Sequence, residues 1–137
     1  MRVGPQAVVG GWRTPLQAVE VFAGAYVNWS ARTVSAQLRA LAEVSVGQAR
    51  SAMELAAGEA ARDYELQRAG IANSGVVEAV APLRGSPGHY AIVTLERTTA
   101  ADSAAYRGLR PAWHVTLAAV TRVAGGLWVL SSWQPES

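Results

Sequence analysis

The pattern of hydrophobic and polar residues changes near residue 70, and this change divides the chain into two parts. Before residue 70, apolar residues recur at every third or fourth position, which is the spacing of one face of an α-helix. After it, apolar and polar residues alternate, as in a strand with one buried face. The sequence therefore predicts an α+β domain, with three N-terminal helices packed on a curved four-stranded antiparallel sheet.

Three helix starts are marked by residues that cap free backbone N–H groups. Residues 14–17, Thr-Pro-Leu-Gln, place a capping threonine before proline and put glutamine at the third helical position. Ser30 is expected to cap the second helix and Ser45 the third, and Gly70 is expected to end the third. The buried stripe predicted for the third helix consists of Ala49, Met53, Ala56, Ala60 and Tyr64.

Four strands are predicted at residues 77–83, 89–98, 112–123 and 127–134. In the last hairpin, a three-residue loop places Val123 opposite Leu127. The same register places Leu117 opposite Trp133 and joins two apolar faces. A two-residue loop would instead turn Trp128 inward, so the three-residue loop is favoured. The face of the third strand expected in the core is Trp113, Val115, Leu117, Ala119 and Val123.

Length and composition narrow the class of protein. The 137 residues fit a single domain spanning 1–137, in which 1–13 is expected to be an extended or flexible N-terminal arm. Cysteine is absent, which excludes disulfides, thiolate metal sites and a cysteine nucleophile. All twelve basic residues are arginines scattered along a chain of net charge +2, so no nucleic-acid partner is expected.

No segment approaches the roughly 20 consecutive apolar residues that span a bilayer. The first dozen residues also lack the apolar stretch of a signal peptide. The chain as given is therefore expected to be soluble. Any membrane association would depend on an anchor absent from this sequence or on a partner.

Candidate catalytic residues are few, and no metal or cofactor is predicted. His89 and His114 form no metal-ligand spacing, and the glycines form no phosphate-binding pattern. His114 is either a general base in a sheet-lined pocket or an ordinary sheet histidine on the more polar strand face, and the second interpretation is favoured. Glu78 and Glu96 are expected to face each other on the first two strands, more often as arginine partners than as an acid/base pair.

Tryptophan is enriched, with five residues, and two interpretations compete. Such rings line pockets and partner contacts, but they also fill space in an alanine-rich core. Core packing is favoured for Trp29, Trp113 and Trp133, whereas Trp128 alternates to the opposite face and is the better contact candidate. The candidate pocket or contact residues are Tyr26, Trp29, Trp113, His114, Trp128 and Trp133.

Two aromatic segments carry a resemblance to a known family. They are FAGAYVNW at 22–29 and WVLSSWQP at 128–135, with the stretch 39–50 between them. Helices followed by a strongly bent antiparallel sheet resemble the nuclear-transport-factor-2-like, or cystatin-like, cone. Within that fold the chain is similar to conjugation proteins of actinobacterial type, the TcpC and VirB-eight assembly factors of type IV secretion.

The resemblance implies a non-enzymatic scaffold that self-associates, contacts other channel components and lies close to a membrane. The family's N-terminal transmembrane helix is missing from the chain as given. The alternative is a small-molecule-binding domain or an enzyme of the same fold, similar to polyketide cyclases and ketosteroid isomerases. Its base would be His114, Asp102 or Glu96. A plain dimerisation module is a third class, since fold alone does not decide function.

Overall fold

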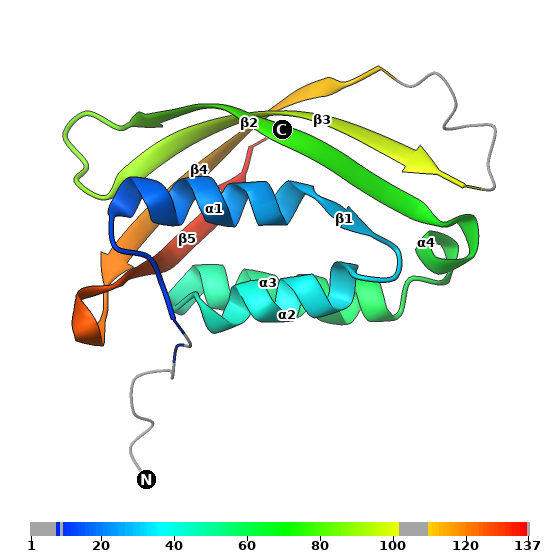
Figure 1. Ribbon diagram of the computed structural model, residues 1–137, viewed down its shortest axis with the longest axis horizontal. Helices are drawn as coiled ribbons and strands as arrows, with labels where there is room; N and C mark the ends of the chain where they lie inside the picture. The colour runs from blue at the N-terminus through cyan, green and yellow to red at the C-terminus, as the bar shows by residue number, and fades with distance from the viewer. Residues whose placement is uncertain (1–7, 9, 102–109, 137) are drawn as a thin grey trace, which may run out of the picture.

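The computed structural model describes residue 8, residues 10–101 and residues 110–136, and these residues form a helical layer beneath a curved sheet (Figure 1). The sheet is five-stranded and antiparallel, in the order β1-β2-β3-β4-β5. The helices cover one face of it, here called the inner face, and the opposite face is called the outer face. The predicted α+β class is confirmed.

The structure contains one strand and one helix more than predicted. The helices are α1 (Pro15–Val27), α2 (Val34–Glu43), α3 (Gly47–Ala61) and α4 (Tyr64–Ala69). The strands are β1 (Trp29–Ser30), β2 (Ile71–Pro82), β3 (His89–Ala100), β4 (Ala112–Arg122) and β5 (Trp128–Pro135). The additions are β1 and α4, and β2 begins at residue 71 rather than 77.

The first helix begins as predicted. The Thr14 hydroxyl oxygen accepts a hydrogen bond from the Gln17 N–H at 3.1 Å, and Gln17 Oε1 accepts one from the Arg13 N–H at 3.2 Å. These bonds satisfy two N–H groups near the helix start that have no partner within the helix. Residues 14–17 therefore begin α1.

The two predicted serine caps are wrong. Ser30 lies in β1, and α2 follows Thr33 without a side-chain capping bond. Ser45 is fully buried, and its hydroxyl donates to the Leu41 carbonyl at 2.6 Å. A serine hydroxyl that bonds a carbonyl of the preceding helix is no longer directed at the next helix. As a result α3 begins one residue later than a Ser45 cap would place it, after Val46.

The core lies between the helices and the inner face of the sheet. Phe22 of α1 packs against Trp133 of β5, with ring centroids 4.7 Å apart. Met53 of α3 and Ile92 of β3 are also almost completely buried. The small side chains around them allow close approach of helices and sheet. They include Ala18, Ala23, Ala49, Ala57 and Ala118.

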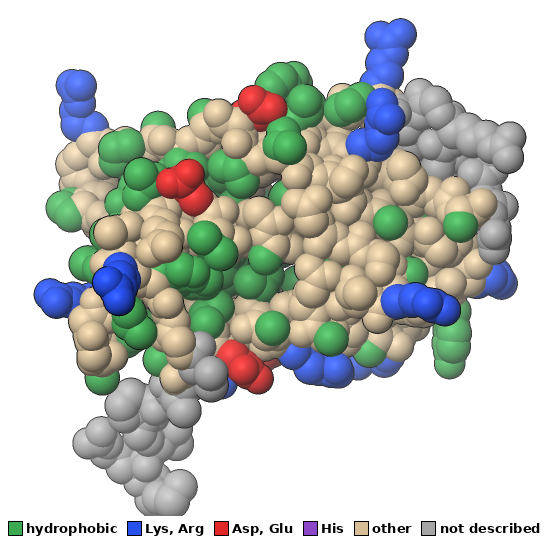
Figure 2. All heavy atoms as spheres, in the orientation of Figure 1, with side chains coloured by type: hydrophobic (Ala, Val, Ile, Leu, Met, Phe, Trp, Pro, Cys, Tyr) green, Lys and Arg blue, Asp and Glu red, His purple; other side chains and the backbone are tan. Residues whose placement is uncertain are grey.

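Charged side chains lie mostly around the outline of the view in Figure 2, with hydrophobic side chains between them. Every basic residue in the chain is an arginine, and in this view the arginines form small separate groups rather than one continuous row. Tight binding to nucleic acid depends on several cations that meet neighbouring phosphates. This face of the described residues offers no such stripe.

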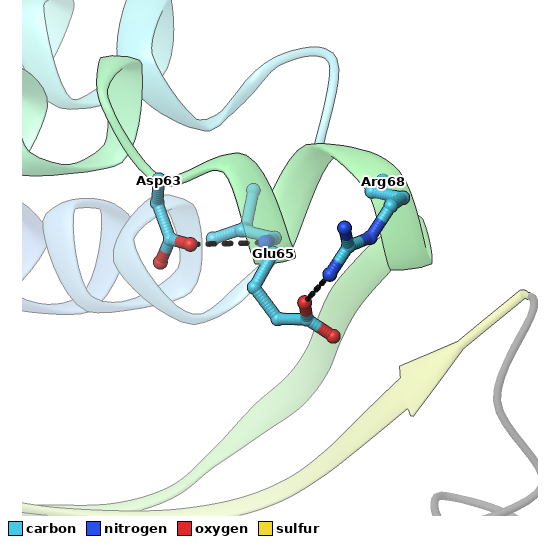
Figure 3. Close-up of polar contacts among 4 residues, drawn as sticks. Asp63, Glu65 and Arg68 are labelled. Carbon is cyan, nitrogen blue, oxygen red and sulfur yellow. Dashed lines mark hydrogen bonds and ion pairs between the residues drawn. The ribbon is translucent and has the colours of Figure 1, made fainter.

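The predicted third helix breaks at Asp63 (Figure 3). Asp63 Oδ1 accepts a hydrogen bond from the Leu66 N–H at 3.0 Å and thereby caps a new helix, α4, in which Glu65 pairs with Arg68. The break leaves Tyr64 86% exposed, so its predicted place in the buried stripe is wrong. Asp is a strong capping residue, and a periodic apolar pattern cannot reveal such a break. Gly70, with φ of 63°, ends α4.

From Trp113 to Leu117 the more buried face of β4 is the opposite of the one predicted, whereas Ala119 is buried as predicted. Trp113 is 61% exposed and Val115 also lies on the outer face, whereas Thr116, Ala118 and Val120 are buried. Both faces of this strand carry apolar residues, so alternation alone cannot determine which face is inside. The inner face uses the smaller side chains because Phe22 and Trp133 already fill the space beneath it.

The three-residue loop of the last hairpin is confirmed. The Val123 N–H donates to the Leu127 carbonyl at 2.8 Å, and the loop residues Ala124–Gly126 form a short 3-10 turn. Gly125 and Gly126 both have positive φ, which glycine adopts without steric cost. Register is therefore as predicted at the turn, but it changes farther along the strands.

Ser131 is an extra residue in β5, and it shifts the register by one position. Trp133 pairs with Ala118 instead of the predicted Leu117. A bulge of this kind also changes which side chains share a face. Trp128 consequently packs against the same core as Trp133 rather than pointing to the opposite side.

Candidate functional site

The structure distributes the six candidate residues over the two faces of the sheet. Trp133 is 2% exposed and lies in the core, as expected. Tyr26 and Trp29 are half-buried beneath the sheet, and the Tyr26 ring contacts Trp133 edge-on at 5.1 Å between centroids. Trp113 was expected in the core and is exposed on the outer face, whereas Trp128 was expected to be the contact residue and packs against the core.

A pocket of about 270 Å³ lies under the sheet, between its inner face and the helices. One wall is apolar and comes from α2 and α3, the second is aromatic and comes from α1 and β1, and the third is polar and comes from β2 and β3. The lining residues are Tyr26, Trp29, Val34, Leu38, Ala56, Asn73 and Glu96. Both aromatic lining residues and Glu96 were candidates from the sequence, whereas Asn73 was not.

The Glu96 carboxylate is the charged group of this pocket. Its Oε1 accepts a hydrogen bond from Asn73 Nδ2 at 3.0 Å, and its Oε2 accepts one from the Thr94 hydroxyl at 2.6 Å. Asn73 is itself fixed, because it also donates to the Val27 carbonyl at 2.7 Å and accepts from Thr98 at 2.9 Å. The strands and α1 therefore hold the carboxylate in one orientation.

The predicted pairing of Glu78 with Glu96 is wrong. Glu96 pairs with Gly75 across the β2–β3 ladder, and Glu78 is the extra residue of a bulge in β2. Glu78 is exposed, whereas Glu96 is half-buried. The two carboxylates therefore do not form an acid/base pair.

Burial raises the pKa of the Tyr26 hydroxyl above its ordinary value of 10.0, and the negative charge of Glu96 raises it further. The neighbouring Trp133 indole opposes this shift in pKa. Trp133 Nε1 has no hydrogen-bond partner of good geometry among the described residues. Its effect on the pKa of Tyr26 is therefore smaller than that of a well-formed hydrogen bond. Tyr26 is therefore a neutral phenol at physiological pH.

Of the other two candidate bases, the structure describes only His114. His114 pairs with Thr94 across the β3–β4 ladder, and the more polar strand face on which it was expected is the inner face, where it is half-buried. It is not among the pocket-lining residues. Asp102 lies outside the described residues. His89 is exposed at a turn, with Nδ1 3.2 Å from the Pro87 carbonyl oxygen.

The outer face of the sheet carries a contiguous apolar surface, the outer patch, defined by Val76, Leu95, Trp113, Val93 and Val115. Val76 pairs with Leu95, and Leu95 pairs with Trp113, so these three side chains cross β2, β3 and β4 in one row. Val93 and Val115 form the next pair on the same face. Val76 is 54% exposed and Trp113 is 61% exposed. Single exposed apolar residues are ordinary, but a contiguous group marks a contact surface.

The free edge of β5 is covered by groups of the chain itself. Trp12 exchanges two backbone hydrogen bonds with Trp128, at 2.9 and 2.7 Å. The Val46 N–H donates to the Leu130 carbonyl at 2.8 Å. The Gln48 side chain accepts from the Trp133 N–H at 2.7 Å and donates to its carbonyl at 3.2 Å. These partners block strand addition along β5.

The predicted N-terminal arm, 1–13, lies partly outside the described residues. Its last residues pack on the rest of the chain, because Trp12 pairs with β5 and Gly11 lies against Leu127 and Val129. None of the described helices has the length and hydropathy of a membrane span. The described residues also contain no group of three or more potential metal ligands.

Helices packed inside a strongly curved antiparallel sheet define the nuclear-transport-factor-2-like fold, which is the fold of this chain. Among solved structures, the chain is similar to the VirB8 protein of Agrobacterium tumefaciens, with a TM-score of 0.63 and 12% sequence identity. The alignment covers 89% of this chain and 90% of that one. No protein-family profile and no curated protein matches the sequence. The similarity is therefore one of fold.

Proposed function

We propose that the protein is a non-enzymatic structural component of a conjugative transfer or type IV secretion apparatus, in the manner of the VirB-eight and TcpC assembly factors. It acts through contacts with other proteins, including copies of itself. Its membrane association depends on an anchor or on a partner. The likeness in fold to VirB8, over nine-tenths of both chains, supports this proposal.

The outer patch is the observation that carries the proposal. A folded sheet needs only one apolar face for its core, and the inner face provides it here. The apolar side chains at Val76 and Trp113 are left in water, where they contribute little to folding. A protein partner that covers them would remove this apolar area from water, and the tryptophan is the residue type most enriched among energetically dominant contacts.

The closed β5 edge restricts how that contact forms. Many proteins associate by adding a strand to a free sheet edge. Along β5 the backbone groups of Trp128, Leu130 and Trp133 already have partners from the same chain. Strand addition along β5 is therefore blocked, whereas a contact through the outer patch uses side chains rather than backbone groups.

A transfer assay tests the proposed function. In the bacterium that carries the gene, deletion is expected to reduce DNA transfer or secretion to background, and wild-type protein is expected to restore it. Trp113→Asp places a charge in the outer patch and is expected to fail to restore transfer although the protein accumulates. Normal transfer after deletion would contradict the proposal.

Glu78→Gln is the matched control, because Glu78 is exposed but lies on the bulge of β2, outside the outer patch. It is expected to restore transfer fully. The genes beside this one provide an independent check, since secretion ATPases and relaxases are expected among them.

A further inference from the structure

We propose that the pocket under the sheet binds a small organic cation whose ammonium group is held by Glu96 and the aromatic side chains of Tyr26 and Trp29. This inference does not depend on the proposed function. The pocket lies beneath the inner face, whereas the outer patch lies on the opposite side of the sheet.

The first argument is the charge of Glu96. A carboxylate withdrawn from water needs donors, and a cation is the partner that compensates its charge. Two donors to the Glu96 carboxylate are the Asn73 amide and the Thr94 hydroxyl, and both are neutral. Neutral donors stabilise a carboxylate but do not compensate its charge. A cationic ligand in the pocket would provide a positive charge beside it.

The second argument is the composition of the walls. Tyr26 and Trp29 border the same cavity as the carboxylate, and the electron-rich faces of tyrosine and tryptophan attract organic cations. Burial and the charge of Glu96 raise the pKa of Tyr26, so this wall stays uncharged at neutral pH. An aromatic wall beside a carboxylate favours an ammonium ion with methyl or methylene groups over a metal ion.

The third argument is order and size. Asn73 has partners on β3 and α1, so the carboxylate it holds is positioned before any ligand arrives. The volume of about 270 Å³ is below the roughly 300–1,000 Å³ of pockets for drug-sized ligands. A small ammonium compound fits this volume, and a nucleotide or a folded peptide does not.

Titration calorimetry with choline, tetramethylammonium and butylammonium tests the inference. At least one of these probes is expected to bind the wild-type protein saturably with one site. The neutral isostere 3,3-dimethyl-1-butanol has the shape of choline without its charge, and it is expected to bind about tenfold or more weakly. Absence of binding by all three cations, or equal binding by the neutral isostere, would overturn the inference.

Variants locate the site. Glu96→Gln keeps the shape of the side chain but removes its charge, and it is expected to weaken binding by about tenfold or more. Glu78→Gln removes an exposed carboxylate outside the pocket and is expected to bind as wild type does. Trp29→Leu is a second test that leaves the Glu96 hydrogen bonds intact and is expected to weaken binding. Unchanged affinity in a folded Glu96→Gln or Trp29→Leu protein would contradict the proposed site.

Discussion

The two faces of the sheet are built from the same strands but carry different residues. On β4, the inner face presents Thr116, Ala118 and Val120, which are buried, whereas the outer face presents Trp113 and Val115, which are exposed. If large apolar side chains were always buried, the ring of Trp113 would lie on the inner face. The inner face instead uses small residues because aromatic rings from α1 and β5 fill the cone. The difference indicates that the inner face determines the fold and the outer face is available for contact.

Truncating one tryptophan on each face gives the largest expected contrast. Trp133→Ala removes a ring that contacts Phe22 and Tyr26 in the core, and it is expected to lower the free energy of unfolding by about 3–5 kcal/mol. Trp113→Ala removes a ring that is 61% exposed and is expected to change it by about 0.5 kcal/mol or less. Urea denaturation measures both. Equal losses would contradict the division between the faces.

Two glycines sharpen the contrast at the inner face. A Cβ at Gly75 would lie 2.9 Å from both Val27 Cγ2 and Glu96 Cγ, so Gly75→Ala is expected to cost about 1–3 kcal/mol of stability. A Cβ added at Gly24 in α1 would have no neighbour among the described residues within 4 Å beyond the adjoining backbone of the helix. Gly24→Ala is therefore expected to raise the free energy of unfolding by about 0.5–1 kcal/mol. The same denaturation experiment compares them. An unchanged free energy of unfolding in Gly75→Ala would show that the inner face is packed less tightly around Gly75 than the structure indicates.

The covered edge of β5 provides a third test. Gln48→Ala removes both side-chain bonds to the Trp133 backbone and is expected to cost about 1–3 kcal/mol in the free energy of unfolding. Gln134→Ala alters an exposed glutamine near the end of β5 and serves as the control. Hydrogen exchange of the Trp133 amide is expected to accelerate in Gln48→Ala only. An unchanged exchange rate would show that this edge is not protected by Gln48.

The smallest expected effect is the pH dependence caused by Tyr26. Its pKa is raised in the folded protein by burial first and by Glu96 second, so the folded state holds the phenol proton more tightly than the unfolded state does. Stability from this group is complete below the ordinary pKa of 10.0 and is lost as pH rises through the raised value. Tyr26→Phe is expected to reduce this alkaline loss. Tyr64→Phe, at a tyrosine that is 86% exposed, is expected to leave it unchanged.

Periodicity was sufficient for the order of the three longer helices and the four long strands but missed β1 and α4, and local chemistry was sufficient for the start of α1. The start of α1 could be predicted because its two capping bonds, Gln17 to Thr14 and Arg13 to Gln17, join residues three and four positions apart in sequence. The break at Asp63 had a signal of the same kind, a strong capping residue, but the apolar pattern continues through it. The loop after Val123 was also predictable, because two glycines permit its positive φ angles.

Features that depend on distant parts of the chain could not be predicted in this way. Nothing in the local pattern at Ser131 or Glu78 marks an extra residue, yet each bulge changes which side chains face the core. The bulge at Ser131 places Trp133 opposite Ala118 instead of Leu117, and the bulge at Glu78 removes that residue from the ladder of pairs. Asn73 was missed because residues 71–76, rich in small and polar side chains, do not alternate as a strand does. Its role depends on contacts with Val27 and Glu96, far away in sequence.

Sedimentation equilibrium over a wide concentration range tests the central claim, that the outer patch is a contact surface for proteins, most directly. The wild-type chain has a monomer mass of 14.4 kDa, and its average mass is expected to rise above this value with concentration. Trp113→Asp is expected to remain at 14.4 kDa throughout, with Glu78→Gln behaving as wild type. A wild-type protein that stays monomeric at every concentration, or one whose association survives Trp113→Asp, would contradict the account.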